Sequence, residues 1–187
     1  MISTADFKNG VTIFVDKEPY QIIWFQNHKP GKGGAVMRTK MKHLRKGSII
    51  ERTFKSGERF DSVDVERRKK QYMYNDGTNY HFMDMVSFDQ AEVPKEKLGE
   101  QANFLTENME VQAVYLEGEL VDIEMPLNVV LTVAETEPGV RGDTVSNVMK
   151  PAKLETGADV RVPLFIKQGD KVRIDTRTGE YVERVTE

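Results

Sequence analysis

The sequence contains no cysteine, so it can form neither a disulfide framework nor a thiolate metal site. Its three histidines, His28, His43 and His81, lie far apart and lack the spacing of metal ligands, so we expect neither a metal nor a cofactor. No stretch approaches the roughly 20 apolar residues of a membrane span, and the N-terminus has no basic segment followed by an apolar run. We therefore expect a cytoplasmic protein that does not contact membranes.

Sequence signatures of an enzyme are also missing. The pair Gly31-Lys32 is followed by glycine, not by serine or threonine, and the upstream glycine of a nucleotide-binding loop is absent. There is no Gly-x-Ser-x-Gly motif, and no two acidic residues stand out as an acid and a base. A lysine that forms Schiff bases needs a desolvated site, which a glycine-rich loop does not provide. We therefore expect no enzymatic activity.

Charge is distributed unevenly along the 187 residues, although the formal net charge is only −3. Residues 28–70 contain 14 Lys and Arg against 5 Asp and Glu, whereas residues 89–139 contain 12 acidic and 2 basic residues. The basic block predicts a surface that faces phosphates, from which the acidic block would be repelled. The alternative is that the two blocks form differently solvated faces of the protein.

The most informative segment present is Lys29-Pro30-Gly31-Lys32-Gly33-Gly34, between strand-like runs at residues 20–26 and 36–42. Pro30 fixes its own φ and favours an extended residue before it. The three glycines can adopt backbone conformations closed to other residues and leave Lys32 uncrowded. The segment therefore predicts a long hairpin that presents one amine at its tip, where the amine can probe, tether or be modified.

Alternating apolar and polar residues dominate the rest of the chain and predict an all-β fold. Glycine-bearing turns separate the runs, whose spacing is typical of small barrels. We expect an SH3-like barrel over residues 1–63 and two oligonucleotide-binding (OB) barrels over residues 64–127 and 128–187. Further strands are predicted at residues 11–15, 48–54, 71–74, 80–83, 109–116, 120–125, 128–133, 160–166, 171–175 and 180–185, and a short helix at residues 94–105.

Two other features could contact nucleic acid. Tyr72, Tyr74, Tyr80 and Phe82 alternate on two paired strands, where they either stack on bases or fill a barrel core. The loop at residues 139–144 combines two glycines with an Asp-Thr pair, which can hydrogen-bond bases or sugars or form an ordinary turn. These features keep open a second function, that of a general single-stranded nucleic-acid-binding protein.

Several motifs together resemble bacterial elongation factor P over essentially the whole chain. They are the tip segment with the following Arg38, Lys40 and Lys42, the triplet Gly142-Asp143-Thr144, and the run Lys150-x-Ala152, Gly157, Val160-x-Val162-Pro163 and Gly169. The resemblance implies a KOW/SH3-like barrel followed by two OB barrels, in an L-shaped arrangement that resembles a tRNA. It also implies a monomeric translation factor that binds the 70S ribosome between the P and E sites and relieves stalling at consecutive prolines.

The resemblance also assigns roles to single residues. It implies that Lys32 is modified by a lysine-modifying enzyme and that residues 29–34 contact the CCA end of the P-site peptidyl-tRNA. Arg38, Lys40 and Lys42 would then contact phosphates. Gly142, Asp143 and Thr144 would contact the mRNA codon in the E site, and Tyr181 and Arg184 would lie near the tRNA anticodon stem. The family's glycines after the codon loop are replaced here by residues 146–149, Ser-Asn-Val-Met.

Overall fold

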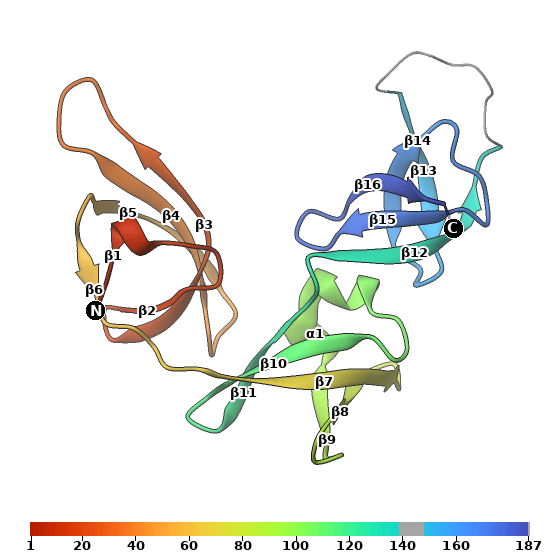
Figure 1. Cartoon of the computed structure of the whole chain (residues 1–187), viewed down its shortest axis with the longest axis horizontal. Helices are drawn as coiled ribbons and strands as arrows, with labels where there is room; N and C mark the ends of the chain where they lie inside the picture. Colours follow the sequence, from red (N-terminus) through yellow and green to blue (C-terminus); the bar gives the residue numbers. More distant parts are fainter. Residues whose placement is uncertain (139–147, 187) are drawn as a thin grey trace. The chain divides into compact units, whose positions relative to one another are not determined.

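The structure, a computed structural model, describes residues 1–138 and 148–186 (Figure 1). It is all-β, as predicted. In the described part of the chain, helix is limited to α1 (Lys95–Leu98) and two short 3-10 segments, η1 (Thr4–Asp6) and η2 (Gly99–Phe104). None of the described helices is long and apolar enough to cross a membrane.

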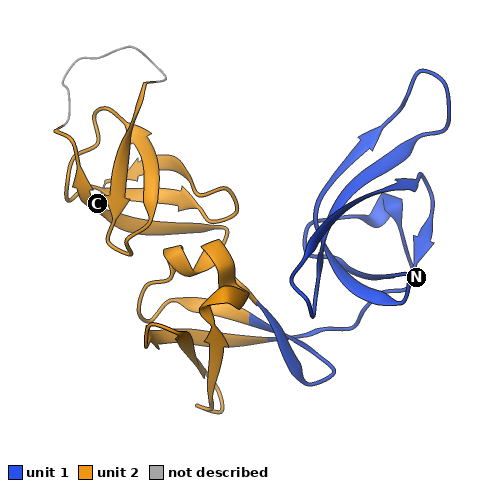
Figure 2. Cartoon of the chain, turned by 180° about the vertical axis from the view of Figure 1, so that it is seen from behind, with its two compact units in different colours: residues 1–67, 113–122 blue, residues 68–112, 123–187 orange. Residues whose placement is uncertain are grey.

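The chain divides into two compact units, which Figure 2 draws in different colours. Unit 1 contains Met1–Arg67 and Ala113–Asp122, and unit 2 contains Arg68–Gln112 and Ile123–Glu187. The division into three domains made from the sequence stays a prediction.

Unit 1 contains a curled antiparallel sheet and a small two-stranded sheet, in keeping with the predicted SH3-like barrel. The core of the barrel includes the mutually packed rings of Phe7, Phe54 and Phe60. In sheet order, the four strands are β2 (Thr12–Val15), β3 (Glu18–His28), β4 (Val36–His43) and β5 (Ile49–Lys55), and the small sheet pairs β1 (Ile2–Ser3) with β6 (Arg59–Phe60).

A β-bulge in β3 decides which way the outer half of that strand faces. Ile22 pairs with Met41 in the core, but the next regular pair is Trp24 with Lys40, so Ile23 is an extra residue. Because side chains alternate along a strand, the extra residue turns Trp24 away from the core side on which Ile22 lies. The bulge therefore places Trp24 on the same face of the hairpin as Lys40.

A second apolar cluster in unit 1 includes residues from the later part of the chain. Leu44 and Val63 pack with Val114, Leu116 and Val121, all of which are buried. The last three lie in β10 (Glu110–Leu116) and β11 (Glu119–Glu124). The turn between these strands uses Glu117 and Gly118, both with positive φ. This hairpin end is therefore part of the packing of unit 1.

Unit 2 begins with the strands β7 (Glu66–Asn75), β8 (Asn79–Asp84) and β9 (Gln90–Pro94), which pair in that order. The full sheet has the order β11-β10-β7-β8-β9. Tyr72, Tyr80 and Phe82 are buried and pack on one another, which identifies them as core residues. Tyr74 is the exposed member of the predicted aromatic set. The predicted helix at residues 94–105 is a single α-helical turn, α1, continued by the 3-10 segment η2.

The second sheet of unit 2 curls around a core that includes Leu131, Val162, Ile166, Val172 and Ile174. Strand β12 (Asn128–Thr136) takes part in both halves of this sheet. Its first part pairs with β15 and its last part pairs with β13. This sharing closes the sheet into an OB-type barrel. In sheet order, the strands are β14 (Asp159–Pro163), β13 (Met149–Leu154), β12 (Asn128–Thr136), β15 (Lys171–Asp175) and β16 (Glu180–Val185).

Four strands of the described residues were not predicted, namely β1, β6, β9 and β13. The sequence of β13 contains Pro151, and proline within a run argues against a strand because it has no amide hydrogen for the ladder. In the structure, the pairing of β13 with β12 ends at Ala152, one residue before Pro151 is reached, while Pro151 pairs with Arg161 of β14. The predicted strand at residues 160–166 ends early, at Pro163.

Candidate functional site

The segment between β3 and β4 forms the tip of a hairpin, as predicted (Figure 1). Lys32 is exposed, and within the described residues its side chain makes no hydrogen bond or ion pair. Gly33 has a φ of 123°, and a Cβ built on it would lie 3.8 Å from Cγ of Pro30. Gly31 and Gly34 do not have positive φ, and no atom lies within 4 Å of a Cβ built on them. Of the three glycines, only Gly33 therefore has a conformation that excludes other residues.

The hairpin below this tip has two different faces. Residues that pair across antiparallel strands point to the same side, so the register assigns the faces. Met37, Thr39 and Met41 are buried on the core side. The opposite side carries Trp24, Gln26 and His28 of β3, Arg38 and Lys40 of β4, and Glu51, Thr53 and Lys55 of β5. We call this second set the outer hairpin face.

The three predicted phosphate contacts differ in how strongly they are tied to the protein. Arg38 pairs with Glu51 at 2.9 Å, and both side chains are largely exposed. Nζ of Lys40 lies 5.7 Å from the centroid of the Trp24 ring, within the range of a cation–π contact. Lys42 instead pairs with Asp122 at 3.0 Å, and these side chains are only 22% and 10% exposed. Arg38 and Lys40 are therefore available to a phosphate, whereas Lys42 already has a nearly buried counter-ion.

Trp24 is a residue that the sequence interpretation missed. It is the one tryptophan of the chain, is 37% exposed, and lies directly opposite Lys40. An alternating pattern read from Ile22 would place it in the core, because such a pattern contains no sign of the bulge at Ile23. Its position beside Lys40 gives the outer hairpin face an aromatic surface as well as positive charge.

A second aromatic–cation pair lies in the C-terminal barrel of unit 2. The guanidinium of Arg184 lies 5.7 Å from the centroid of Phe165, whose side chain is half exposed. Phe165 is in a turn that is closed by a hydrogen bond from the Ile166 amide to the carbonyl of Pro163. Tyr181 packs against the core of the barrel, and burial raises its pKa, against the opposing effect of the Arg184 amide. Arg184 is thus displayed on the surface, whereas the Tyr181 side chain is partly buried against the core of the barrel.

The predicted codon-contacting residues Gly142, Asp143 and Thr144 lie outside the described residues. The described residues on either side of them are tied to each other. Oγ1 of Thr136 donates to the carbonyl of Pro151 at 3.0 Å, and the buried Nζ of Lys150 donates to the carbonyl of Glu137. The two strands that lead to and from this segment are therefore held together at its base.

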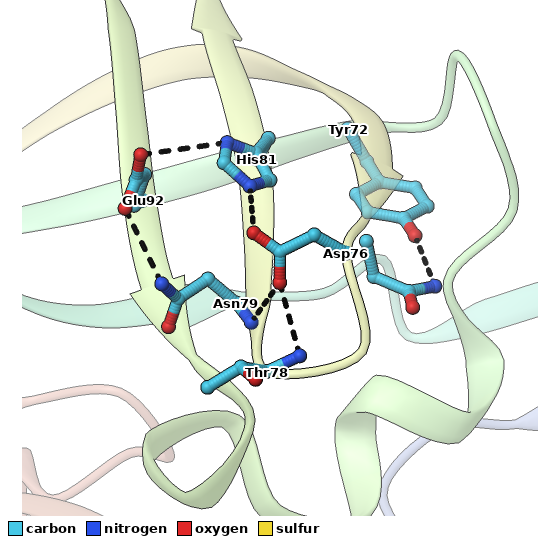
Figure 3. Close-up of polar contacts among 7 residues, drawn as sticks. Tyr72, Asp76, Thr78, Asn79, His81 and Glu92 are labelled. Carbon is cyan, nitrogen blue, oxygen red and sulfur yellow. Dashed lines mark hydrogen bonds and ion pairs between the residues drawn. The ribbon is translucent and has the colours of Figure 1, made fainter.

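His81 has a structural explanation (Figure 3). Its Nε2 lies 2.8 Å from Oδ2 of Asp76, and its ring stacks on Tyr74 with centroids 4.4 Å apart. Oδ1 of Asp76 also accepts amide hydrogen bonds from Asn79 and Thr78, at 2.8 and 3.0 Å. These amides, with His81, lower the pKa of Asp76 to about 2. The cluster closes the turn between β7 and β8.

No group of three or more metal-ligating side chains occurs in residues 1–138 and 148–186. The structure brings the tip, Arg38 and Lys40 together on one hairpin of unit 1, while Tyr181 and Arg184 share strand β16 of unit 2. The arrangement of unit 1 suits the binding of a phosphate backbone by a projecting arm, with an unpaired amine at its end.

Three protein-family models match the chain. One, described as the elongation factor P KOW-like domain, matches residues 3–60. A second, described as the elongation factor P OB domain, matches residues 65–123. The third, elongation factor P, C-terminal, matches residues 129–184.

Relatives with the same name match along their full length. Elongation factor P of Endomicrobium trichonymphae is 62% identical over 184 residues, covering 98% of this chain and all of the relative. The protein of the same name from Moorella thermoacetica is 53% identical, again over 98% of this chain and all of the relative. Among solved structures, eukaryotic translation initiation factor 5A from Methanococcus jannaschii matches with a TM-score of 0.44 and 22% identity, covering 66% of this chain and 93% of that one.

Proposed function

The chain belongs to the elongation factor P family, and from this membership we propose that it binds the 70S ribosome between the P and E sites and promotes peptide-bond formation at consecutive prolines. It is a translation elongation factor by family. The finer statements about site, substrate and modification are the proposal. The observation that carries it is the exposed Lys32, without a partner among the described residues, at the end of a hairpin with a basic and aromatic outer face.

The proposed mechanism is one of positioning. Proline is a rigid acceptor and a poor nucleophile, so the two reacting groups seldom reach the geometry of attack. Contacts from residues 29–34 that hold the CCA end of the P-site peptidyl-tRNA reduce the entropic part of this barrier. Such a factor needs no general base, nucleophile or cofactor of its own, and we assign no catalytic residue to it.

Lys32 is proposed to be the site of modification by a lysine-modifying enzyme. Its amine is exposed on a slim loop, where an enzyme has access to it. A longer side chain with further hydrogen-bonding groups would extend the reach of the hairpin toward the reacting groups. The fixed φ of Pro30 and the special conformation of Gly33 hold the loop in a defined shape.

The remaining contacts are distributed over both units. We propose that Arg38, Lys40 and, less strongly, Lys42 neutralise tRNA phosphates, since the first two lack a buried counter-ion. We assign the E-site codon of the mRNA to Gly142, Asp143 and Thr144, and the anticodon stem to Tyr181 and Arg184. The chain is proposed to act as a cytoplasmic monomer with domains at residues 1–63, 64–127 and 128–187.

A general single-stranded nucleic-acid binder is less well supported. Such a protein would stack bases on the aromatic strands of unit 2. Tyr72, Tyr80 and Phe82 are buried in the core instead, at 4%, 8% and 0% exposure, and only Tyr74 of this set faces solvent in the described structure.

The rate of Pro-Pro-Pro synthesis on reconstituted ribosomes tests the proposal. We expect Lys32→Ala to fold normally and to lose the stimulation, because the tip then lacks the group that reaches the CCA end. Lys8→Ala is the matched control, since it removes an exposed lysine of the same unit far from the hairpin in the sequence. An undiminished rate with Lys32→Ala would refute the proposal. Intact-mass measurement of the native protein, with peptide mapping over residue 32, tests the modification separately.

A further inference from the structure

The turn between β8 and β9 presents two apolar side chains to solvent. Val86 is 86% exposed, and Phe88, at 68%, is more exposed than any other aromatic residue of the described chain. Neither packs in the apolar clusters around Leu131, Phe54 and Val114. Large apolar side chains displayed this fully on a loop are typical of anchors that fill a pocket on a binding partner.

Phe88 also has an unfavourable backbone conformation. Its φ is 63°, in the left-handed region that a bulky residue seldom occupies. Four other non-glycine residues of the described chain have positive φ, and all four are polar turn residues: Asp16, Lys17, Asn108 and Glu117. Glycine or asparagine would adopt this conformation more readily than phenylalanine does. The side chain of Phe88 is therefore retained at a cost to the stability of the turn.

The turn is held firmly by one aspartate. Oδ1 of Asp84 accepts hydrogen bonds from the amides of Val86 and Ser87, at 2.8 and 3.0 Å. The Asp84 carbonyl accepts a bond from the amide of Phe88 at 3.0 Å. The other carboxylate oxygen lies 3.8 Å from Nζ of the buried Lys70. Val86 and Phe88 are thus presented by an ordered turn, which lowers the entropic cost of docking them.

We propose that Val86 and Phe88 form a docking tip that inserts into an apolar pocket with a basic rim on a protein of the ribosome. This inference rests on the proposed function, because it takes the ribosome as the binding partner. Val86 is aliphatic and has no ring on which a base could stack, so the pair fits a protein pocket better than RNA.

The charge around the tip also favours a basic protein over RNA. Residues 84–94 contain Asp84, Asp89 and Glu92 and no Lys or Arg, and the last two acids are exposed. Exposed carboxylates beside the tip repel phosphates and attract a basic surface. The nearest cations, on β7, already have acidic partners. Lys69 pairs with Glu110 at 3.2 Å, Lys70 pairs with Asp84, and the charge of Arg68 also attracts Asp84.

Substitution of Phe88 gives a test in which stability and binding move in opposite directions. We expect Phe88→Asn to raise the unfolding temperature of unit 2 by about 2 °C or more, because the backbone strain is relieved. We expect ribosome affinity to fall about tenfold, as for an interface anchor. Phe88→Gly should weaken binding equally. Leu127→Ser is the matched control, since it removes another exposed apolar side chain of unit 2, at 60% exposure, outside the turn.

A photoreactive phenylalanine analogue at position 88 identifies the partner on purified ribosomes. A crosslink to a ribosomal protein that an excess of the unsubstituted chain prevents supports the proposal. A crosslink to RNA or to a second copy of the chain, or no crosslink at all, overturns it. A lower unfolding temperature for both Phe88 variants, or unchanged ribosome binding, also overturns it. Failure of the unsubstituted chain to bind ribosomes would refute the proposed function as well, so the two failures are distinguishable.

Discussion

Lys40→Met and Lys42→Met remove the same charge from the same strand, yet the structure predicts different consequences. Lys40 is exposed and rests on the Trp24 ring. Lys42 is largely enclosed and is 3.0 Å from Asp122, which is itself only 10% exposed. The charge of Lys40 is therefore free to neutralise a phosphate, whereas the charge of Lys42 is already neutralised within unit 1.

The expected magnitudes follow from these surroundings. Removing Lys40 loses an exposed cation–π contact, which lowers the free energy of unfolding by about 0.5–1 kcal/mol. It also removes one phosphate contact, which reduces the slope of log K against log salt concentration by about 0.7–0.9. Removing Lys42 leaves a nearly buried carboxylate without this cation, at a cost of about 1–3 kcal/mol in the free energy of unfolding. We expect Lys42→Met to change the salt slope by less than half as much as Lys40→Met does.

Two measurements separate the variants. The fluorescence of Trp24, the one tryptophan, follows unfolding of unit 1, where each kcal/mol corresponds to about 4–8 °C for a unit of this size. Ribosome affinity at several salt concentrations gives the slope. Lys42→Met/Asp122→Asn is the control, and it should recover part of the lost stability because residue 122 then carries no charge that has lost its Lys42 cation. Equal salt slopes for the two single variants would refute the reasoning, since Lys42 would then leave Asp122 to bind a phosphate.

Two further substitutions test the local geometry of each unit. The folded pKa of Asp76 is about 2, below the ordinary aspartate value of 3.8, so its ionised form stabilises unit 2 above pH 3.8, and this contribution is lost as the pH falls toward 2. Circular dichroism during acid titration should show unsubstituted protein and Asp76→Asn converging over this interval, and a constant difference would count against the hydrogen-bond assignment. Gly33→Ala should shift the amide resonances throughout residues 31–36, because its φ of 123° excludes alanine, whereas Gly31→Ala should shift only its neighbours. Equally local changes in both variants would contradict the assigned tip conformation.

The alternation of apolar and polar residues and the positions of turn residues were sufficient to predict most of the strands. Alternation located β3, β4, β15 and β16 to within two residues, and the glycine-rich segment was correctly placed at a hairpin tip. Strands β1 and β6 could not be found in this way. Each has two residues, and their pairing joins Ile2 to Phe60 across nearly the whole of unit 1. Such pairing depends on contacts that are distant in sequence and leaves no periodic signal.

The candidate site was predicted less completely than the fold. The glycine-rich segment singled out Lys32, and the resemblance to elongation factor P added Arg38, Lys40 and Lys42; their roles in binding stay predictions. The roles of Trp24 and Lys42 depend on a bulge at Ile23 and on Asp122, which comes 80 residues after Lys42. Neither the extra residue of a bulge nor an ion pair of this separation can be read from a single sequence.

The hairpin end at Ala113–Asp122 has a consequence for the order of events during synthesis. Leu44 and Val63 meet Val114, Leu116 and Val121 in unit 1, but the ribosome makes all of residues 68–112 before it reaches these partners. A nascent chain that ends near residue 67 therefore has an N-terminal barrel with an uncovered apolar surface. Chains normally fold domain by domain from the N-terminus as they emerge. In this one the first unit reaches its final packing only after much of the second has been translated.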